Sequence, residues 1–288
     1  INDIMRFLDN VLSDFIDRAP EQFDDAKYSA EKERSVGLGV MGFHSYLQKH
    51  SIPLESVMSK VWNKKIFKHI QENVDQASKD LADERGPCPD AADYGYNERF
   101  SNKTAIAPTA SISIICGGAS PGVEPVAANS YTHKTLSGSF NVRNRYLVEL
   151  LEKHGKNTDE VWSGITTNQG SVSHLDFLTD LEKDVFKTAF ELDQKWIVEL
   201  SGDRTPYISQ AQSINLFVPA DIHKRELHKI HFDAWKKGLK SLYYCRSKSI
   251  QRAENVNDTK STDVTTNVYN AKSQTGEQPE YEECLSCQ

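Results

Sequence analysis

This sequence of 288 residues lacks long apolar runs, a basic surplus and any visible signal for secretion. It has no run of about 18 or more apolar residues, so we expect no membrane-spanning helix. Its 34 Lys and Arg are outnumbered by 41 Asp and Glu, the formal net charge is -7, and no basic face stands out. Direct binding to nucleic acid is therefore disfavoured, because the phosphates demand such a face.

Cysteine is also scarce and irregularly spaced. Of the five cysteines, Cys88, Cys116 and Cys245 stand alone, and only Cys284 and Cys287 form a C-x-x-C pair. An odd number without regular spacing argues against a secreted disulfide scaffold and favours a cytoplasmic protein with reduced thiols. We expect the three solitary cysteines to be small packed residues and the pair to be redox-active.

The spacing of apolar residues predicts a body that mixes helices and strands. The length suffices for one large domain or two small ones. Asp221 is the expected cap of the last helix, and the first helix has no cap before it, so we expect the sequence to continue upstream. Predicted helices cover 1–18, 56–84, 143–154, 180–200 and 221–237, predicted strands cover 213–218 and 239–244, and 104–115 is a buried strand or a loop.

From about residue 254 the composition shifts to Asn, Asp, Thr, Ser, Gln and Glu, with very few large apolar residues. Such a segment cannot bury enough surface to offset the entropy lost on ordering. We therefore divide the chain into a mixed α/β body, residues 1–253, and a flexible tail, residues 254–288, which ends in the C-x-x-C pair.

The glycines of Gly37-Leu38-Gly39-Val40-Met41-Gly42 fit the dinucleotide-binding pattern G-x-G-x-x-G. That fingerprint also requires a second strand that ends in an acidic residue about twenty positions later. The corresponding region, 50–55, contains Pro53, which is unsuited to a central strand. We therefore predict that the glycines permit close packing of a strand and a helix, and NAD binding is disfavoured.

Three groups of motifs and the terminal cysteine pair follow one another along the chain. The first is RSVGLGVMGF at 34–43, the second is APTASIS at 107–113 with GVEP at 122–125 and LSGSF at 136–140, and the third is GLKSLYY at 238–244. Together they span nearly the whole sequence. The set resembles the large, catalytic subunit of aerobic, class I ribonucleotide reductases.

The resemblance implies the second half of a ten-stranded α/β barrel of the ribonucleotide reductase type, followed by the flexible tail. In that family the radical-bearing cysteine, its Asn and Glu neighbours and the active-site cysteine pair lie upstream, and nothing in this sequence matches them. The N-terminal allosteric nucleotide domain has no counterpart either. We therefore expect this polypeptide to be inactive without the N-terminal part of the large subunit.

The second motif group is a candidate phosphate-binding loop. Its hydroxyl groups and free backbone amides at a turn could donate to an anion, although without the resemblance it is a generic Ser/Thr-rich loop. Glu124, in the same motif group, has either a turn or packing role or a contact with substrate. The resemblance implies contacts with the substrate diphosphate at Pro108, Thr109, Ala110, Ser111 and Ile112.

Tyr243 and Tyr244 are adjacent, so on a strand their rings should point to opposite faces, one into the core and one to the surface. The resemblance implies a different role for the pair. Both tyrosines would relay an oxidising equivalent from a small, radical-generating subunit to the active-site cysteine. A phenol suits such a step because it can lose an electron and a proton together.

Cys284 and Cys287 have the spacing of a redox dithiol and also of half a zinc site. No pair of further ligands accompanies them, and His223, His228 and His231 are predicted to form a solvated helix face, so no metal site is expected. A thiol pair on a flexible tether fits disulfide exchange. We expect the tail to re-reduce the active-site disulfide and then to be reduced by thioredoxin or glutaredoxin.

The expected partners are thus the N-terminal part of the large subunit, the small subunit, thioredoxin or glutaredoxin, and a ribonucleoside diphosphate. No cofactor is expected on this segment, and a metal-radical cofactor is expected in the small subunit. An adenosylcobalamin-dependent, class II reductase is the nearest alternative, but it needs no tyrosine relay. A non-catalytic half-protein remains a second alternative, whereas a self-standing thiol oxidoreductase is disfavoured by the terminal position of the cysteines.

Overall fold

The computed structural model describes residues 1–135 and 138–247. The predicted tail, and with it Cys284 and Cys287, lies outside the described residues. None of the helices in the described part combines the length and the apolar character that a membrane-spanning helix requires.

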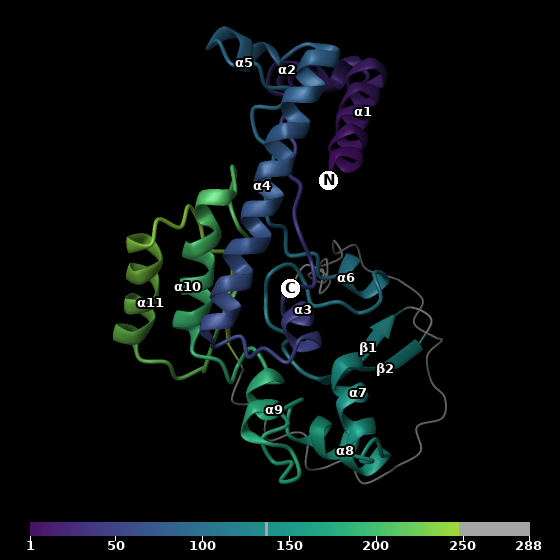
Figure 1. Ribbon diagram of the computed structural model, residues 1–288, viewed down its shortest axis with the longest axis vertical. Coiled ribbons are helices and arrows are strands. Elements are labelled where there is room, and N and C mark those ends of the chain that lie inside the picture. The colour runs from purple at the N-terminus through teal and green to yellow at the C-terminus, as the bar shows by residue number, and fades with distance from the viewer. Residues whose placement is uncertain (136–137, 248–288) are drawn as a thin grey trace, which may run out of the picture.

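The 29-residue helix α4 (Val57–Arg85) runs from one end of the molecule to its middle (Figure 1). Ser56 caps its start by accepting from the Ser59 amide, and Gly86, at φ +85°, ends it. At its C-terminal end α4 meets α1 (Asn2–Arg18), α2 (Asp24–Glu33) and α5 (Pro89–Asp93). A buried cluster beneath these helices contains Met5, Val36, Val74, Ala77, Leu81 and Phe100.

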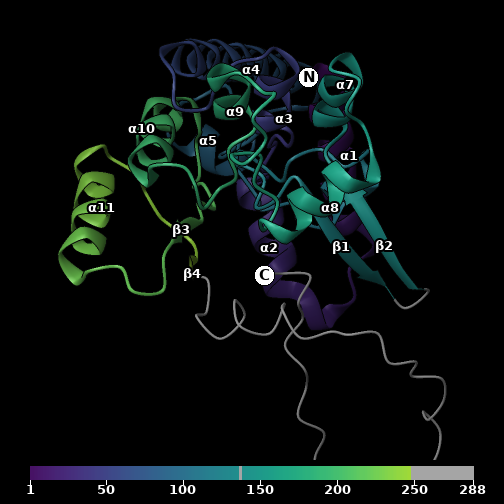
Figure 2. The same cartoon turned by 90° about the horizontal axis from the view of Figure 1, so that it is seen from below.

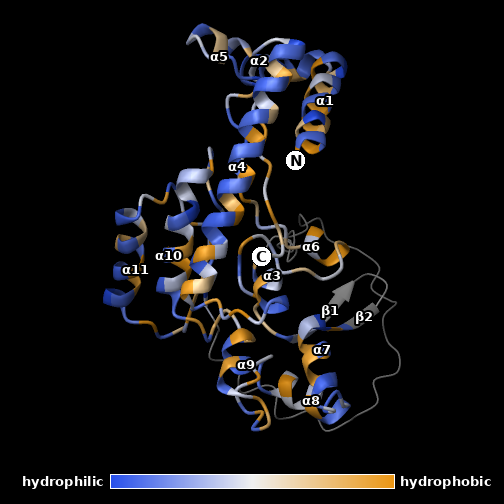
Figure 3. Cartoon of the chain, viewed as in Figure 1, coloured by the Kyte–Doolittle hydropathy of each residue, from blue (hydrophilic) through white to orange (hydrophobic). Residues whose placement is uncertain are grey.

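The other half of α4 packs against α10 (Gln194–Arg204), which in turn packs against α11 (Lys224–Lys236). The short helix α3 (Phe43–Lys49) lies on the inner side of this layer. Figure 3 shows hydrophilic and hydrophobic residues alternating along α4 and α10, as expected for helices with one packed face. The largest buried cluster joins α3, α4 and α10 and includes Phe43, Leu47, Phe67, Ile106, Ile197, Leu200 and Ile214.

Short parallel pairings take the place of a continuous sheet. Strand β3 (Leu216–Val218) pairs in parallel with β4 (Cys245–Ser247), and single parallel bridges join Leu38 to Thr104 and Ile106 to Gln212. Figure 2 shows β3 and β4 beside α10 and α11, with an antiparallel hairpin of β1 (Ser130–Thr135) and β2 (Gly138–Arg143) on the opposite side. The described residues thus mix helices with parallel strand segments and form no closed barrel.

A smaller helical layer follows the hairpin. It contains α7 (Arg145–Lys153), α8 (Asp159–Thr167) and α9 (Asp180–Val185), built around buried Leu147, Trp162 and Phe186. The remaining elements are α6 (Ile112–Ile115) and the 3-10 turns Glu21–Phe23 and Thr205–Tyr207.

Three sequence predictions about this fold were wrong. The predicted helix 180–200 is two helices, α9 and α10, because the Thr188 amide and hydroxyl bond to Glu191 and Asp193 starts a new helix as its cap. His223, not Asp221, caps α11 by accepting from the Arg225 amide. The predicted strand 239–244 is not a strand, and β4 begins only after it.

The packing role predicted for the glycine-rich segment is confirmed at Gly39. A Cβ atom there would lie 2.4 Å from the carbonyl oxygen of Ala105, so only glycine allows the two backbones to approach this closely. The neighbour is the extended segment around the bridge of Thr104, and not the predicted helix.

Candidate functional site

The predicted substrate loop, 108–112, begins directly after the bridged segment at Ile106 and turns sharply. Thr109 adopts φ +54°, a left-handed conformation that is unusual for a β-branched residue. Its hydroxyl oxygen accepts from the Gly122 amide at 2.8 Å, and its carbonyl accepts from the Ser113 amide at 3.0 Å. These bonds hold the loop in one shape against the segment that contains Glu124.

The hydroxyl groups of this loop are not equivalent. Ser113 is buried, and its hydroxyl donates to the carbonyl of Ala110, so it is used within the loop. Ser111 is exposed at the start of α6, beside the exposed Ile112, whereas Pro108, Thr109 and Ala110 are half-buried. The loop therefore presents Ser111 to the surroundings and keeps Thr109 and Ser113 for its own shape.

A pocket of about 260 Å³ adjoins the loop. Ala110 and Ser113 of the loop are among the residues that line it, as are Arg143 and Arg145. The Arg143 guanidinium pairs with Asp159 at 2.9 Å and lies over the Trp162 ring. Cationic side chains thus stand on the same pocket as the loop, which suits an anionic ligand group.

Tyr243 and Tyr244 lie together. Their ring centroids are 4.0 Å apart, the Tyr243 hydroxyl donates to that of Tyr244 at 3.3 Å, and both side chains are nearly half exposed. The expectation of opposite faces, with one tyrosine in the core, was therefore wrong. It assumed a strand at these residues, and β4 starts one residue later.

The backbone of the tyrosine pair is held against residues 214–216. The Tyr243 amide donates to the Ile214 carbonyl at 2.8 Å, and the Tyr244 carbonyl accepts from the Leu216 amide at 2.9 Å. Between them the Tyr244 amide donates to the side-chain oxygen of Asn215 at 3.1 Å. The pair is thus exposed at its rings and fixed at its backbone.

Glu124 connects the two sequence-predicted regions. Its side chain is buried, and its two carboxylate oxygens accept from the Asn215 amide and side-chain Nδ2, each at 3.1 Å. Burial raises the pKa of Glu124, while the bonds from Asn215 and the charges of Arg246 and Arg204 act against this rise. The contact of Glu124 is with Asn215, which the sequence analysis did not identify as a site residue. The sequence feature that could have indicated it is a single polar amide side chain within the apolar run 214–218.

Arg204 is the other buried charge near the core of this region. It is 1% exposed, and burial lowers its pKa to about 9. Its guanidinium donates to Gln212 at 2.6 Å, Asn63 at 3.0 Å and Ser201 at 2.8 Å. These partners are neutral, so Arg204 connects α4, α10 and the segment before β3 through hydrogen bonds and not through an ion pair.

The prediction that the three solitary cysteines are packed residues is confirmed for one of them and wrong for two. Cys88 is buried as expected, but Cys116 and Cys245 are exposed, so a packing role for those two was wrong. The Cys245 side chain is nevertheless partly screened from solvent, and this desolvation raises the pKa of its thiol. Across residues 1–135 and 138–247 no cluster of three or more His, Cys, Asp or Glu could hold a metal ion. His223, His228 and His231 are exposed on or beside α11, as predicted.

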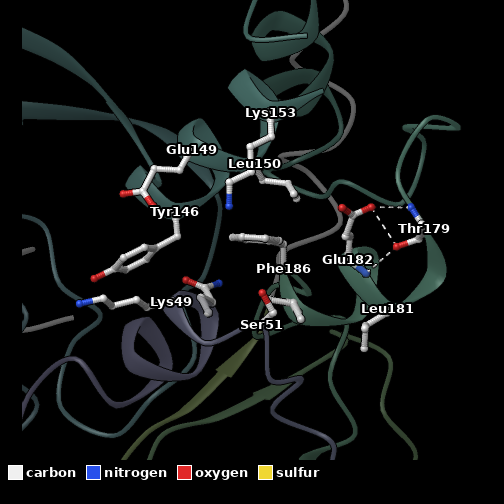
Figure 4. A pocket seen from close by; sticks show the side chains of 12 residues that line it. Lys49, Ser51, Tyr146, Glu149, Leu150, Lys153, Thr179, Leu181, Glu182 and Phe186 are labelled. Atoms are coloured by element: carbon white, nitrogen blue, oxygen red, sulfur yellow. Dashed lines mark hydrogen bonds between the residues drawn. The ribbon is translucent and has the colours of Figure 1, made fainter. Parts of the chain in front are cut away.

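A second pocket of about 300 Å³ lies between α3, α7 and α9 (Figure 4). In that view Lys49, Tyr146, Lys153 and Phe186 surround one hollow, and Glu182 is engaged by Thr179 in a capping box. None of the sequence-predicted site residues lines it. The loop and the tyrosine pair, joined through Glu124, therefore form the candidate functional site.

Comparisons with known proteins agree on one family. A family model described as "Ribonucleotide reductase, barrel domain" matches residues 1–99 and 90–245. The chain is 49% identical over 260 residues to the ribonucleoside-diphosphate reductase large subunit of Invertebrate iridescent virus 6, and 45% identical over 263 residues to that of Invertebrate iridescent virus 3.

A solved structure extends this likeness to the fold. The alpha subunit of the class Id ribonucleotide reductase of Actinobacillus ureae matches with a TM-score of 0.80 and 38% sequence identity, over 88% of this chain and 47% of that chain. The viral alignments cover 89% and 90% of this chain but 27% and 41% of the relatives. The chain therefore spans less than half the length of each of these relatives.

Proposed function

Because this chain belongs to the ribonucleotide reductase large-subunit family, we propose that it forms part of a catalytic subunit that reduces ribonucleoside diphosphates to deoxyribonucleoside diphosphates. In that reaction the 2′-hydroxyl of the ribose leaves as water, and two thiols are oxidised to one disulfide. The observation that carries the proposal is the match to large subunits over nearly nine-tenths of this chain.

The role proposed for the loop 108–112 is to hold the substrate diphosphate. The exposed hydroxyl of Ser111 supports this role, as do the cations Arg143 and Arg145 on the adjoining pocket. Thr109 contributes by fixing the loop through its bond with Gly122. A diphosphate would then bind through hydroxyl, amide and guanidinium donors, which are the groups that phosphates prefer.

The role proposed for Tyr243 and Tyr244 is radical transfer between a partner small subunit and the active site. Ring centroids 4.0 Å apart and a direct hydroxyl contact favour transfer from one phenol to the other. Their partial exposure leaves the pair accessible from a neighbouring subunit. The metal-radical cofactor belongs in this proposal to the small subunit.

The division into a body, 1–253, and a redox tail, 254–288, is likewise proposed. Cys284 and Cys287 would reduce the disulfide that each turnover leaves in the N-terminal part of the subunit, and thioredoxin or glutaredoxin would reduce the tail. We propose a cytoplasmic setting, where thiols stay reduced; the three cysteines of the described residues are free thiols.

The direct test combines this chain, the N-terminal part of the subunit, a radical-bearing small subunit and thioredoxin with a ribonucleoside diphosphate. Deoxynucleotide formation should require every component. A Cys284→Ser or Cys287→Ser variant should complete one or two turnovers per site and then stop. No product from an assembled mixture would reject the proposal in favour of a non-catalytic half-protein, and product that depends on adenosylcobalamin would favour the class II alternative.

A further inference from the structure

We propose that Glu124 is a positioning residue that fixes Tyr244 relative to the substrate loop, acting through Asn215. The inference rests on the proposed function, because it takes the loop and the tyrosine pair as parts of one catalytic site. It depends on contacts inside the chain, between side chains that are almost fully buried: Glu124 is 6% exposed and Asn215 is 1% exposed.

The first step is the orientation of the Asn215 amide. One Glu124 oxygen accepts from the Asn215 backbone amide and the other from its Nδ2, each at 3.1 Å. A carboxylate has no donor, so it determines that Nδ2, and not Oδ1, faces Glu124. The Oδ1 atom is then turned the other way, where it accepts from the Tyr244 amide at 3.1 Å.

The second step is the connection to the loop. The Glu124 amide donates to the Pro121 carbonyl at 3.0 Å, which closes a turn, and the Gly122 amide within that turn donates to Thr109 Oγ1 at 2.8 Å. A displacement of the loop at Thr109 is therefore passed to Glu124 through a short, hydrogen-bonded turn. From Glu124 it reaches the Tyr244 backbone through Asn215.

The Glu124 carboxylate has no positively charged side chain bonded to it among the described residues. Within residues 1–135 and 138–247 it forms no salt bridge, and its hydrogen-bond donors come from Asn215 alone. Arg204 and Arg246 contribute charge but no direct bond to it. A buried carboxylate with neutral partners adds little to stability, since desolvation opposes its charged form. Its distinct contribution is to the orientation of Asn215 and hence of Tyr244.

Glu124→Gln tests this orientation directly. The new amide has one acceptor and one donor, so Asn215 must flip to avoid two facing donors, and its Nδ2 then opposes the Tyr244 amide. In the complete large subunit with its small subunit, we expect kcat to fall about 10- to 100-fold, as for other small misplacements of reacting groups. KM for the ribonucleoside diphosphate and the melting temperature should change little.

A rescue variant separates positioning from general structure. In the double variant Glu124→Gln/Asn215→Asp, the new carboxylate can accept from both the new glutamine and the Tyr244 amide. We expect it to recover most of the lost kcat, whereas Asn215→Asp alone should be impaired by two facing carboxylates. Glu182→Gln, which removes a capping-box carboxylate on α9, is the matched control and should leave kcat unchanged.

Three outcomes would overturn the inference. They are an unchanged kcat in Glu124→Gln, a raised KM with unchanged kcat, or a double variant no better than the single one. Should Glu124→Gln fail to fold, Asn215→Ala provides the same comparison, because it removes the acceptor of the Tyr244 amide. Failure of the proposed function would be seen separately, as absent turnover in the wild type or full turnover in Tyr244→Phe.

Discussion

Asp9 and Glu124 are two buried carboxylates with opposite surroundings. Burial acts to raise the pKa of Asp9, but hydrogen bonds from Arg99, Arg85 and Arg34 overcome it, and the pKa of Asp9 lies below its usual value. For Glu124 burial prevails, and its pKa lies above its usual value. The kind of hydrogen-bond partner, and not burial alone, therefore decides whether the pKa of a buried carboxyl group rises or falls.

The partners also show what each acid connects. Asp9, on α1, binds Arg34 at 2.7 Å, Arg85 at 2.8 Å and Arg99 at 2.8 Å. Arg34 directly follows α2, Arg85 is the last residue of α4, and Arg99 lies before the segment that is bridged at Thr104. Its ion pairs hold one end of the molecule together. Glu124 instead accepts from the backbone amide and the side-chain amide of one residue, Asn215, which also contacts the backbone of the exposed tyrosine pair.

The largest expected effect on stability is from Asp9→Ala. It leaves three arginines without their common partner, and breaking a buried ion pair costs about 3–5 kcal/mol. Denaturant unfolding of the complete large subunit should show this loss, with amide exchange in α1 accelerated and kcat per folded molecule unchanged. Asp14→Asn, in the exposed pair with Arg18, is the control and should have a much smaller effect. Equal losses in both variants would remove the contrast between Asp9 and surface charges.

The next effect concerns substrate binding. Ser111→Glu places a negative charge on the exposed part of the loop, and we expect KM for the ribonucleoside diphosphate to rise about tenfold or more, equivalent to about 1.4 kcal/mol. Ser101→Glu, at another exposed serine, is the control and should leave KM unchanged. An unchanged KM in Ser111→Glu would take the loop out of the substrate site.

A smaller effect should appear on acidification. Glu124 has a raised pKa, so it takes up a proton before Asp9 does, and kcat should fall while the Asp9 ion pairs persist. Protonation of Glu124 does not weaken folding, because the folded state binds that proton more tightly; the Asp9 contribution is lost only as pH falls through its lowered pKa. Burial lowers the pKa of His44 to about 4, so this side chain stays neutral above about pH 4. Burial lowers the pKa of Arg204 to about 9, so its charge, which acts on Glu124, persists throughout acidification.

Activity and melting temperature measured together against pH would check this order. The acid limb of kcat should lie at higher pH than the acid loss of stability, and Glu124→Gln should lack that limb. Coincident losses would mean that the fall in kcat reports unfolding and not the state of Glu124.

Some elements could be predicted because their signals are local. The helices predicted at 1–18 and 56–84 correspond to α1 and α4, whose apolar spacing and, for α4, cap and terminal glycine are all within the segment. The predicted helix 180–200 failed because apolar spacing continues through a region in which Thr188 and Glu191 bond locally. Helix propensity and apolar spacing do not reveal such hydrogen bonds between side chains and the backbone.

Sequence motifs indicate the residues proposed for the candidate site but not the contacts between them. The loop and the tyrosine pair carry recognisable motifs, but Glu124 and Asn215 are 91 positions apart, and their contact depends on how the parallel segments pair. The arrangement of the tyrosine rings likewise depends on backbone hydrogen bonds to residues 214–216. A prediction from the residues 239–244 alone contains no information about these distant partners. Long-range pairing of this kind leaves no periodic signal in the sequence.

Radical transfer through the tyrosine pair is tested by turnover of the complete reductase with Tyr243→Phe or Tyr244→Phe. Either change removes one hydroxyl from an exposed pair, so the free energy of unfolding should change by about 1 kcal/mol or less. We expect no detectable deoxynucleotide formation by either variant, with substrate affinity and folding retained. Substantial turnover by either variant would contradict a class I catalytic subunit that transfers its radical through this pair.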